Sequence, residues 1–267
     1  QGAGITYKVP LWQPEHEYTS LDVAVSRKVQ QGVTAFGTGV ELNYNRRSQT
    51  DWQQTVFVKY LNENLEVTGQ PEVRSQLGLG GVRVKKTQRD DLLKPTQGWL
   101  LAAEVQGARR GVISDQSLLR GKVNGKYLHT RGKRDRLLLS GALGSLEAQT
   151  FEELPRELRF FAGGQNSVRG YAFEGLGATN AQGAVIGGRH LIEASVEYEY
   201  PVQGKWSAAT FVDAGNAFND ATDLTMKVGA GIGVRYQSPL GPMRADIAVP
   251  KDDPNDVHFY FSLGPDL

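Results

Sequence analysis

The segment Ile192-Glu-Ala-Ser-Val-Glu-Tyr-Glu-Tyr200 alternates apolar and polar side chains along its whole length. Its even positions are apolar or aromatic, and its odd positions carry three glutamates and one serine. Because successive side chains of a β-strand point to opposite faces, this spacing predicts a strand with one apolar face and one charged face.

The same alternation recurs before and after this segment. The other alternating segments are 21–25, 36–44, 56–60, 99–105, 123–127, 137–143, 226–236, 243–249 and 259–263. With less regular stretches included, the pattern predicts about eight strands before residue 151 and five after residue 188, and no long helix. One change of phase between Leu77 and Lys85 predicts a β-bulge near Gly80 and Gly81. The fold class is therefore predicted to be all-β.

Strand length and charge distinguish a membrane barrel from a soluble sandwich, which also alternates. Several segments run to about ten residues or more, the length that a tilted membrane-spanning strand requires. The polar faces are dense in charge, and one predicted strand carries Arg120, Lys122, Asn124 and Lys126 on a single face, as suits a wet barrel interior. We therefore predict a transmembrane antiparallel β-barrel. The lipid-facing side chains would include Ile192, Val196, Val228, Ile232, Ile247 and Phe261.

Composition excludes several other classes of protein. No apolar run approaches the roughly 18 residues of a membrane-spanning helix, and a net charge of +1 gives no basic patch for nucleic acid. The chain has no cysteine, and its four histidines lack metal-ligand spacing. Nucleophile-elbow and phosphate-loop motifs are also absent from the sequence, so we expect a non-catalytic protein without metal or cofactor. The chain begins at Gln1 without a signal peptide, and its natural start is expected to lie elsewhere.

Residues 151–188 interrupt the alternation and form a long predicted loop. The loop contains Gly163 and Gly164, which adopt backbone angles closed to other residues, and the motif Val168-Arg169-Gly170-Tyr171. The Arg169 guanidinium is a planar fork of five donors that matches a carboxylate. Glu197 and Asp213, on the charged faces of the next two strands, are its candidate partners. A glycine-rich surface turn with a solvated arginine is the alternative interpretation.

A third strand after the loop offers space beside these carboxylates. Gly229, Gly231 and Gly233 occupy the polar face of this strand and leave a groove without side chains. A loop folded into the barrel would fit against this groove, although such glycines also occur where a barrel wall bends. The glycines and carboxylates together predict that Arg169 anchors the loop inside the barrel.

Several motifs resemble the barrel of the POTRA-bearing outer-membrane assembly and transport superfamily, and within it the TamA family. They are Arg159–Gly164, Val168–Tyr171, Ser195–Tyr198, Phe211–Gly215, Ser238–Pro242 and the ending Phe259–Leu267. The resemblance is specific from Leu158 onward and weaker but collinear before it. It implies a barrel of about sixteen strands whose arginine loop folds inward onto acidic residues, here Arg169 with Glu197 and Asp213. Residues 1–267 would then be a C-terminal barrel domain that lacks its first strands and any POTRA sequence.

The resemblance also implies a function in the bacterial outer membrane. Such a barrel would insert or translocate β-barrel proteins such as autotransporters through a weak seam between its first and last strands. Gly264-Pro265 predicts a bend in the last strand at this seam. The implied partners are an inner-membrane TamB-like protein, met through periplasmic domains, the client outer-membrane proteins and membrane lipid. Two alternatives are a polypeptide pore of the two-partner secretion type and the barrel anchor of a patatin-like lipase.

Overall fold

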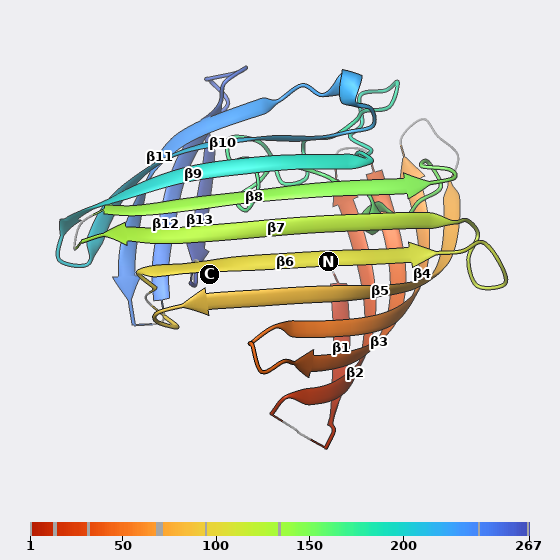
Figure 1. Cartoon of the computed structure of the whole chain (residues 1–267). Coiled ribbons are helices and arrows are strands. Elements are labelled where there is room, and N and C mark those ends of the chain that lie inside the picture. Colours follow the sequence, from red (N-terminus) through yellow and green to blue (C-terminus); the bar gives the residue numbers. More distant parts are fainter. Residues whose placement is uncertain are drawn as a thin grey trace.

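The computed structural model describes residues 2–12, 15–30, 33–67, 72–93, 95–132, 135–239, 241–265 and 267. Thirteen strands form one antiparallel sheet in which neighbours in sequence are neighbours in space, and the sheet curls into a barrel wall (Figure 1). The strands are β1 (Gly2–Pro10), β2 (Glu17–Gln30), β3 (Val33–Arg47), β4 (Gln53–Val67), β5 (Val73–Arg89), β6 (Gln97–Ala108), β7 (Leu118–Arg131), β8 (Asp135–Ala148), β9 (His190–Gln203), β10 (Trp206–Phe218), β11 (Lys227–Ser238), β12 (Gly241–Pro250) and β13 (His258–Leu263). The predicted all-β antiparallel fold is confirmed, as are eight strands before the loop and five after it.

Most of these strands are long enough to cross a bilayer. β5 has 17 residues and β9 has 14, whereas a tilted membrane strand needs about 9 to 11. β13 is the exception with 6 residues. The described residues include two short 3-10 turns, η1 (Arg156–Leu158) and η2 (Ala221–Asp223). In the part of the chain that the structure describes, no helix has the length and apolar character to cross a membrane.

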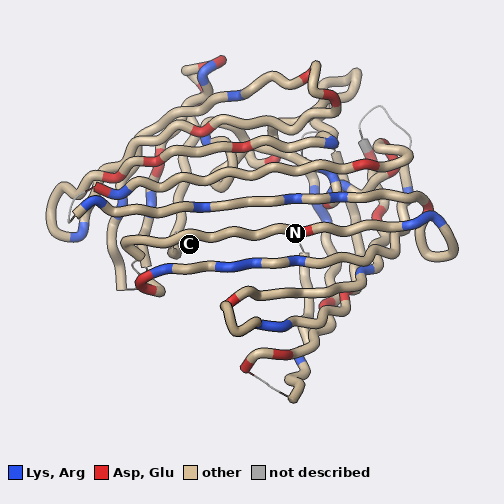
Figure 2. Tube along the Cα trace, viewed as in Figure 1, with Lys and Arg blue, Asp and Glu red and all other residues tan. Residues whose placement is uncertain are grey.

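The outer face of the sheet is apolar and the inner face is charged. Val196 is 51% exposed and Val234 is 47% exposed, while Glu197 and Arg235, which follow them directly, are buried. The other side chains predicted to face lipid lie on the same outer face, where Ile232, Ile247 and Phe261 are exposed and Ile192 and Val228 are half-buried. Charged residues lie along the lengths of the strands as well as at their ends (Figure 2). Apolar groups outside and charges inside define a membrane β-barrel wall.

Apolar side chains of the long β8–β9 connection fill part of the interior. Leu154 and Leu158 of this connection belong to one buried cluster with Leu77 and Leu79 of β5. β5 pairs with β4 from Gln53↔Lys85 to Leu65↔Val73 without a register shift, so the predicted bulge near Gly80 and Gly81 is wrong. The change of phase in the apolar pattern of β5 arises instead because Leu77 and Leu79 face the interior, where they pack against apolar side chains of the β8–β9 connection.

β1 and β13 are the two edges of the sheet. Within the described residues β1 pairs with β2 alone and β13 pairs with β12 alone, so the sheet is not closed. The ladder between β12 and β13 ends at Leu263, and Gly264 follows with φ 138°. The Gly264 amide still donates to the Pro242 carbonyl at 3.1 Å. The role of Gly264 at a seam stays a prediction.

The outward position of Val196 predicts the effect of a charge there. Val196 lies near the middle of β9, so Val196→Arg would place a cation in the hydrocarbon region and destabilise the barrel by about 2–4 kcal/mol. The free energy of unfolding in lipid bilayers, measured by urea titration, checks this value, with Val196→Leu as the apolar control. Equal stability of the arginine variant and the wild type would contradict a lipid-facing position.

Candidate functional site: the loop held inside the barrel

The β8–β9 connection folds back on itself before it reaches the wall. Its backbone forms antiparallel bridges at Phe160↔Gly188 and Ala162↔Leu176. Gly163 and Gly164 both have φ 98°, and the Gly164 amide donates to the Tyr171 carbonyl at 3.1 Å. This turn presents the next segment of the loop, which contains Val168 and Arg169, to the interior of β9–β12.

Arg169 binds the wall through its backbone and through its whole guanidinium group. Nε lies 2.7 Å from Oδ2 of Asp213 and Nη2 lies 3.0 Å from Oδ1, so the pair is bidentate. Nη1 lies 2.6 Å from Oε2 of Glu197 and 3.2 Å from Oδ2 of Asp246. The Arg169 amide also donates to Oδ2 of Asp213 at 3.0 Å. The loop is therefore connected to β9, β10 and β12 through one residue.

A second arginine on the wall balances the carboxylates. Arg235 of β11 donates to Oε1 of Glu197 at 2.6 Å and to Oδ1 of Asp246 at 2.5 Å. Asp213 also accepts a hydrogen bond of 2.5 Å from the Ser195 hydroxyl. The two guanidinium groups and three carboxylates form one connected, buried network. Because the groups are paired and hydrogen-bonded, the large cost of burying separate charges is offset.

The guanidinium of Arg169 stacks on an aromatic ring of the wall. The central carbon of the Arg169 guanidinium lies 3.4 Å from the ring centroid of Phe211, in β10 two residues before Asp213. Phe211 is buried, and a cation stacked on a desolvated ring gains about 2 kcal/mol. The same strand face therefore supplies both a stacking surface and a counter-ion for Arg169.

The three glycines of β11 lie at points of close approach. A Cβ atom on Gly229 would come 1.7 Å from the Arg169 carbonyl oxygen, and one on Gly231 would come 2.4 Å from the Phe211 ring. A Cβ atom on Gly233 would come 1.9 Å from Oδ1 of Asp246. Gly229 therefore admits the loop backbone, while Gly231 and Gly233 admit the side chains of Phe211 and Asp246.

Gly170 and Tyr171 continue the contact towards the end of the barrel. Gly170 has φ 96°, and a Cβ atom there would come 2.8 Å from the Val249 carbonyl group. The Tyr171 hydroxyl donates to Asp252, which also pairs with Lys227 at 2.5 Å. Hydrogen bonds from Lys227 and then from Tyr171 lower the pKa of Asp252 to about 2. Asp252 therefore stays ionised at neutral pH and accepts both bonds.

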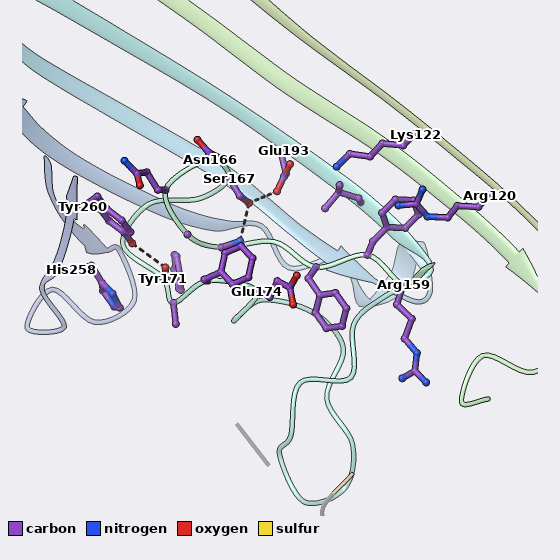
Figure 3. A pocket seen from close by; sticks show the side chains of 18 residues that line it. Arg120, Lys122, Arg159, Asn166, Ser167, Tyr171, Glu174, Glu193, His258 and Tyr260 are labelled. Atoms are coloured by element: carbon purple, nitrogen blue, oxygen red, sulfur yellow. Dashed lines mark hydrogen bonds between the residues drawn. The ribbon is translucent and has the colours of Figure 1, made fainter. Parts of the chain in front are cut away.

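The loop and the wall also line an open pocket of about 540 Å³ (Figure 3). Its lining includes Arg120, Lys122 and Glu193 from the wall and Ser167 and Glu174 from the loop. Ser167 donates to Glu193 and accepts from the Gly163 amide at 2.8 Å. Within the described ranges no group of three or more histidine or acidic side chains has the arrangement of a metal site. The contacts between the loop and the wall at this site include ion pairs and hydrogen bonds.

The structure brings together most of the residues that the sequence analysis selected. Arg169, Glu197 and Asp213 are in direct contact, and Gly229, Gly231 and Gly233 line the adjacent wall. The sequence analysis omitted Arg235, Asp246 and Tyr260 from the site. The alternation of the sequence does place these three residues on the inner face of the sheet. It does not give the strand register that brings them close to Arg169.

The fold and the site define a class of protein, the outer-membrane type β-barrels. In this barrel a buried arginine–carboxylate network holds a long loop against the inner face of the wall. The Omp85 superfamily domain matches residues 2–266, and the chain belongs to this superfamily. Membership confirms the predicted outer-membrane location.

Known proteins and a solved structure resemble this chain. Outer envelope protein 80 of Arabidopsis thaliana chloroplasts is 35% identical over 119 residues, which cover 39% of this chain and 14% of that protein. The outer membrane protein assembly factor BamA of Neisseria meningitidis serogroup B is 27% identical over 303 aligned positions, covering 98% of this chain and 36% of BamA. The crystal structure of BamA from Haemophilus ducreyi lacking POTRA domains 1-3 superposes with a TM-score of 0.79 at 16% identity, covering 97% of this chain and 60% of that one. The aligned part of this chain therefore spans only about a third of the length of the Neisseria BamA and a smaller share of outer envelope protein 80.

Removal of the Arg169 side chain tests the network. Arg169→Ala leaves Asp213, with 0% of its side chain exposed, without its main partner, and leaves Glu197, with 3% exposed, still paired with Arg235. Loss of one partner of a buried pair costs about 3–5 kcal/mol, so the free energy of unfolding in bilayers should fall by that amount. Arg46→Ala removes a surface pair with Glu17 and should cost at most about 1 kcal/mol. Equal small losses in the two variants would contradict a buried network.

Gly229 gives a second test that leaves every charge in place. Gly229→Ala forces a methyl group against the Arg169 carbonyl, so the loop must move away from β11. Limited proteolysis of residues 151–188 should become about tenfold faster, the equivalent of ~1.4 kcal/mol. Gly80→Ala is the matched control, because nothing lies within 4 Å of its added Cβ. Equal protection of the loop in both variants would exclude the close approach at Gly229.

Proposed function

We propose that this chain is the membrane barrel of a bacterial outer-membrane protein assembly factor. It inserts or translocates other β-rich outer-membrane proteins and makes or breaks no covalent bond. The name and function of the BamA relatives support this proposal. A single observation carries it: the loop is fixed by Arg169 on the inner face of the wall formed by β9–β12, next to the last strand, β13.

The edge strand suggests how a client protein is recognised. An edge presents a row of unpaired backbone N–H and C=O groups, to which another strand can add. Hydrogen bonds to the main chain do not depend on side chains, so strand addition accepts many client sequences. The outward side chains beside this edge, which include Phe259, Phe261 and Ile247, are exposed and apolar. A client strand that pairs here would enter the sheet at membrane depth, with lipid on its outer face.

Within the superfamily we propose the TamA-like branch. The support is the sequence resemblance of the loop motif Arg159–Tyr171 and of residues 195–267. In this proposal residues 1–267 form a C-terminal barrel domain that follows periplasmic POTRA domains. Those domains would meet an inner-membrane TamB-like protein, and the clients would include autotransporters.

Complementation tests the function and the branch together. The full-length protein that carries this barrel is expressed in a Gram-negative strain that lacks TamA, and autotransporter at the cell surface is quantified. We expect near-parental levels with the wild type, and at least about a tenfold loss with Arg169→Ala at an equal amount of inserted barrel. Rescue of a BamA-depleted strain instead would contradict the TamA-like branch. Steady ion conductance in bilayer recordings without any client assembly would contradict an assembly role.

A further inference from the structure

The hydroxyl of Tyr260 joins the edge strand β13 to the infolded loop. It accepts a hydrogen bond from the Gly170 amide at 2.9 Å and donates one to the Tyr171 carbonyl at 3.0 Å. Figure 3 shows the Tyr260 side chain directed at Tyr171 at the rim of the pocket. The phenol is thus both donor and acceptor for one short stretch of loop backbone.

Among the described residues, the backbone of β13 pairs with β12 over six positions, from Met243↔Leu263 to Ala248↔His258. Phe259, Phe261 and Leu263 face outward and are exposed. Among the described residues, Tyr260 is the side chain of β13 that hydrogen-bonds the loop. The ring of His258 is stacked with the Tyr260 ring, with 6.2 Å between the ring centroids.

The loop end of this contact is itself fixed by the buried network. Asp246, which binds Arg169 at 3.2 Å, is the register partner of Tyr260 across β12 and β13. Gly170 follows Arg169 directly and is packed against the Val249 carbonyl of β12. Adjacent loop residues therefore bind adjacent strands at one level of the barrel, so a shift of Arg169 moves the groups that Tyr260 binds.

We propose that the Tyr260 hydroxyl is a positioning group that couples the edge strand to the loop. While Gly170 and Tyr171 are seated, β13 is held against β12. When the loop leaves its place, both hydrogen bonds of the phenol are lost and β13 is released for pairing with another strand. The use of this release for client insertion rests on the proposed function, whereas the coupling itself does not.

Hydrogen exchange of the full-length protein in lipid nanodiscs measures the coupling. Tyr260→Phe keeps the ring and its stacking on His258 but removes both hydrogen bonds. We expect the amides of residues 258–263 and of Gly170 to exchange about tenfold faster, with β9 and β10 unchanged. Tyr200→Phe, on the exposed outer face of β9, is the matched control and should leave all rates unchanged.

A second substitution distinguishes coupling from simple loss of stability. Gly229→Ala unseats the loop and should accelerate exchange in β13 when Tyr260 is present. In the Tyr260→Phe background it should add little, because the connection is already broken. Wild-type exchange of β13 in Tyr260→Phe would overturn the inference. An equal effect of Gly229→Ala in both backgrounds would also overturn it, since β13 would then sense the loop by another route.

Client insertion by the same variants separates this inference from the proposed function. Faster insertion by Tyr260→Phe, together with faster exchange of β13, supports both. Faster exchange with unchanged insertion supports the coupling and contradicts the use of the β13 edge in assembly.

Discussion

The buried bidentate pair between Arg169 and Asp213 is the interaction on which the arrangement of the barrel interior depends. Arg169 by itself contacts carboxylates on three strands of the wall, β9, β10 and β12. Its charge is permanent and its five donors lie in one plane, so the group fits only where carboxylates are placed to meet it. A lysine would keep the charge but lose the two parallel bonds to Asp213. Such a pair adds geometric specificity more reliably than net stability.

The surrounding structure is consistent with this constraint at several levels. Phe211 supports the guanidinium, Gly229 leaves room for the loop backbone, and Arg235 neutralises the carboxylates that Arg169 shares. At the other end of the loop, Leu154 and Leu158 pack on inward leucines of β5. The loop is thus held both by ion pairs and by apolar burial. These contacts fix the β8–β9 loop in one position inside the barrel and connect it to the surrounding strands.

Much of this fold and part of the site are predictable from sequence, for a physical reason. Alternation with a period of two reports directly which residues share a face, so the segment Ile192–Tyr200 and its repeats give the strands and their outer surface. Alternation does not report strand register or the course of a long loop. Arg235, Asp246 and Tyr260 reach the loop only through the register of β11–β13, and the sequence analysis therefore omitted them. The inward leucines Leu77 and Leu79 suggested a bulge because their apolar partners lie about 80 residues away in the loop.

A double-mutant cycle between Arg169 and Asp213 tests the central claim most directly. The free energy of unfolding in bilayers is measured for the wild type, Arg169→Ala, Asp213→Ala and the double variant. If the two side chains form the buried pair that holds the loop, their coupling energy should reach about 2–3 kcal/mol, because the second substitution removes an already unpaired partner. Additivity within about 0.5 kcal/mol would show that the two residues do not act together and would contradict the account.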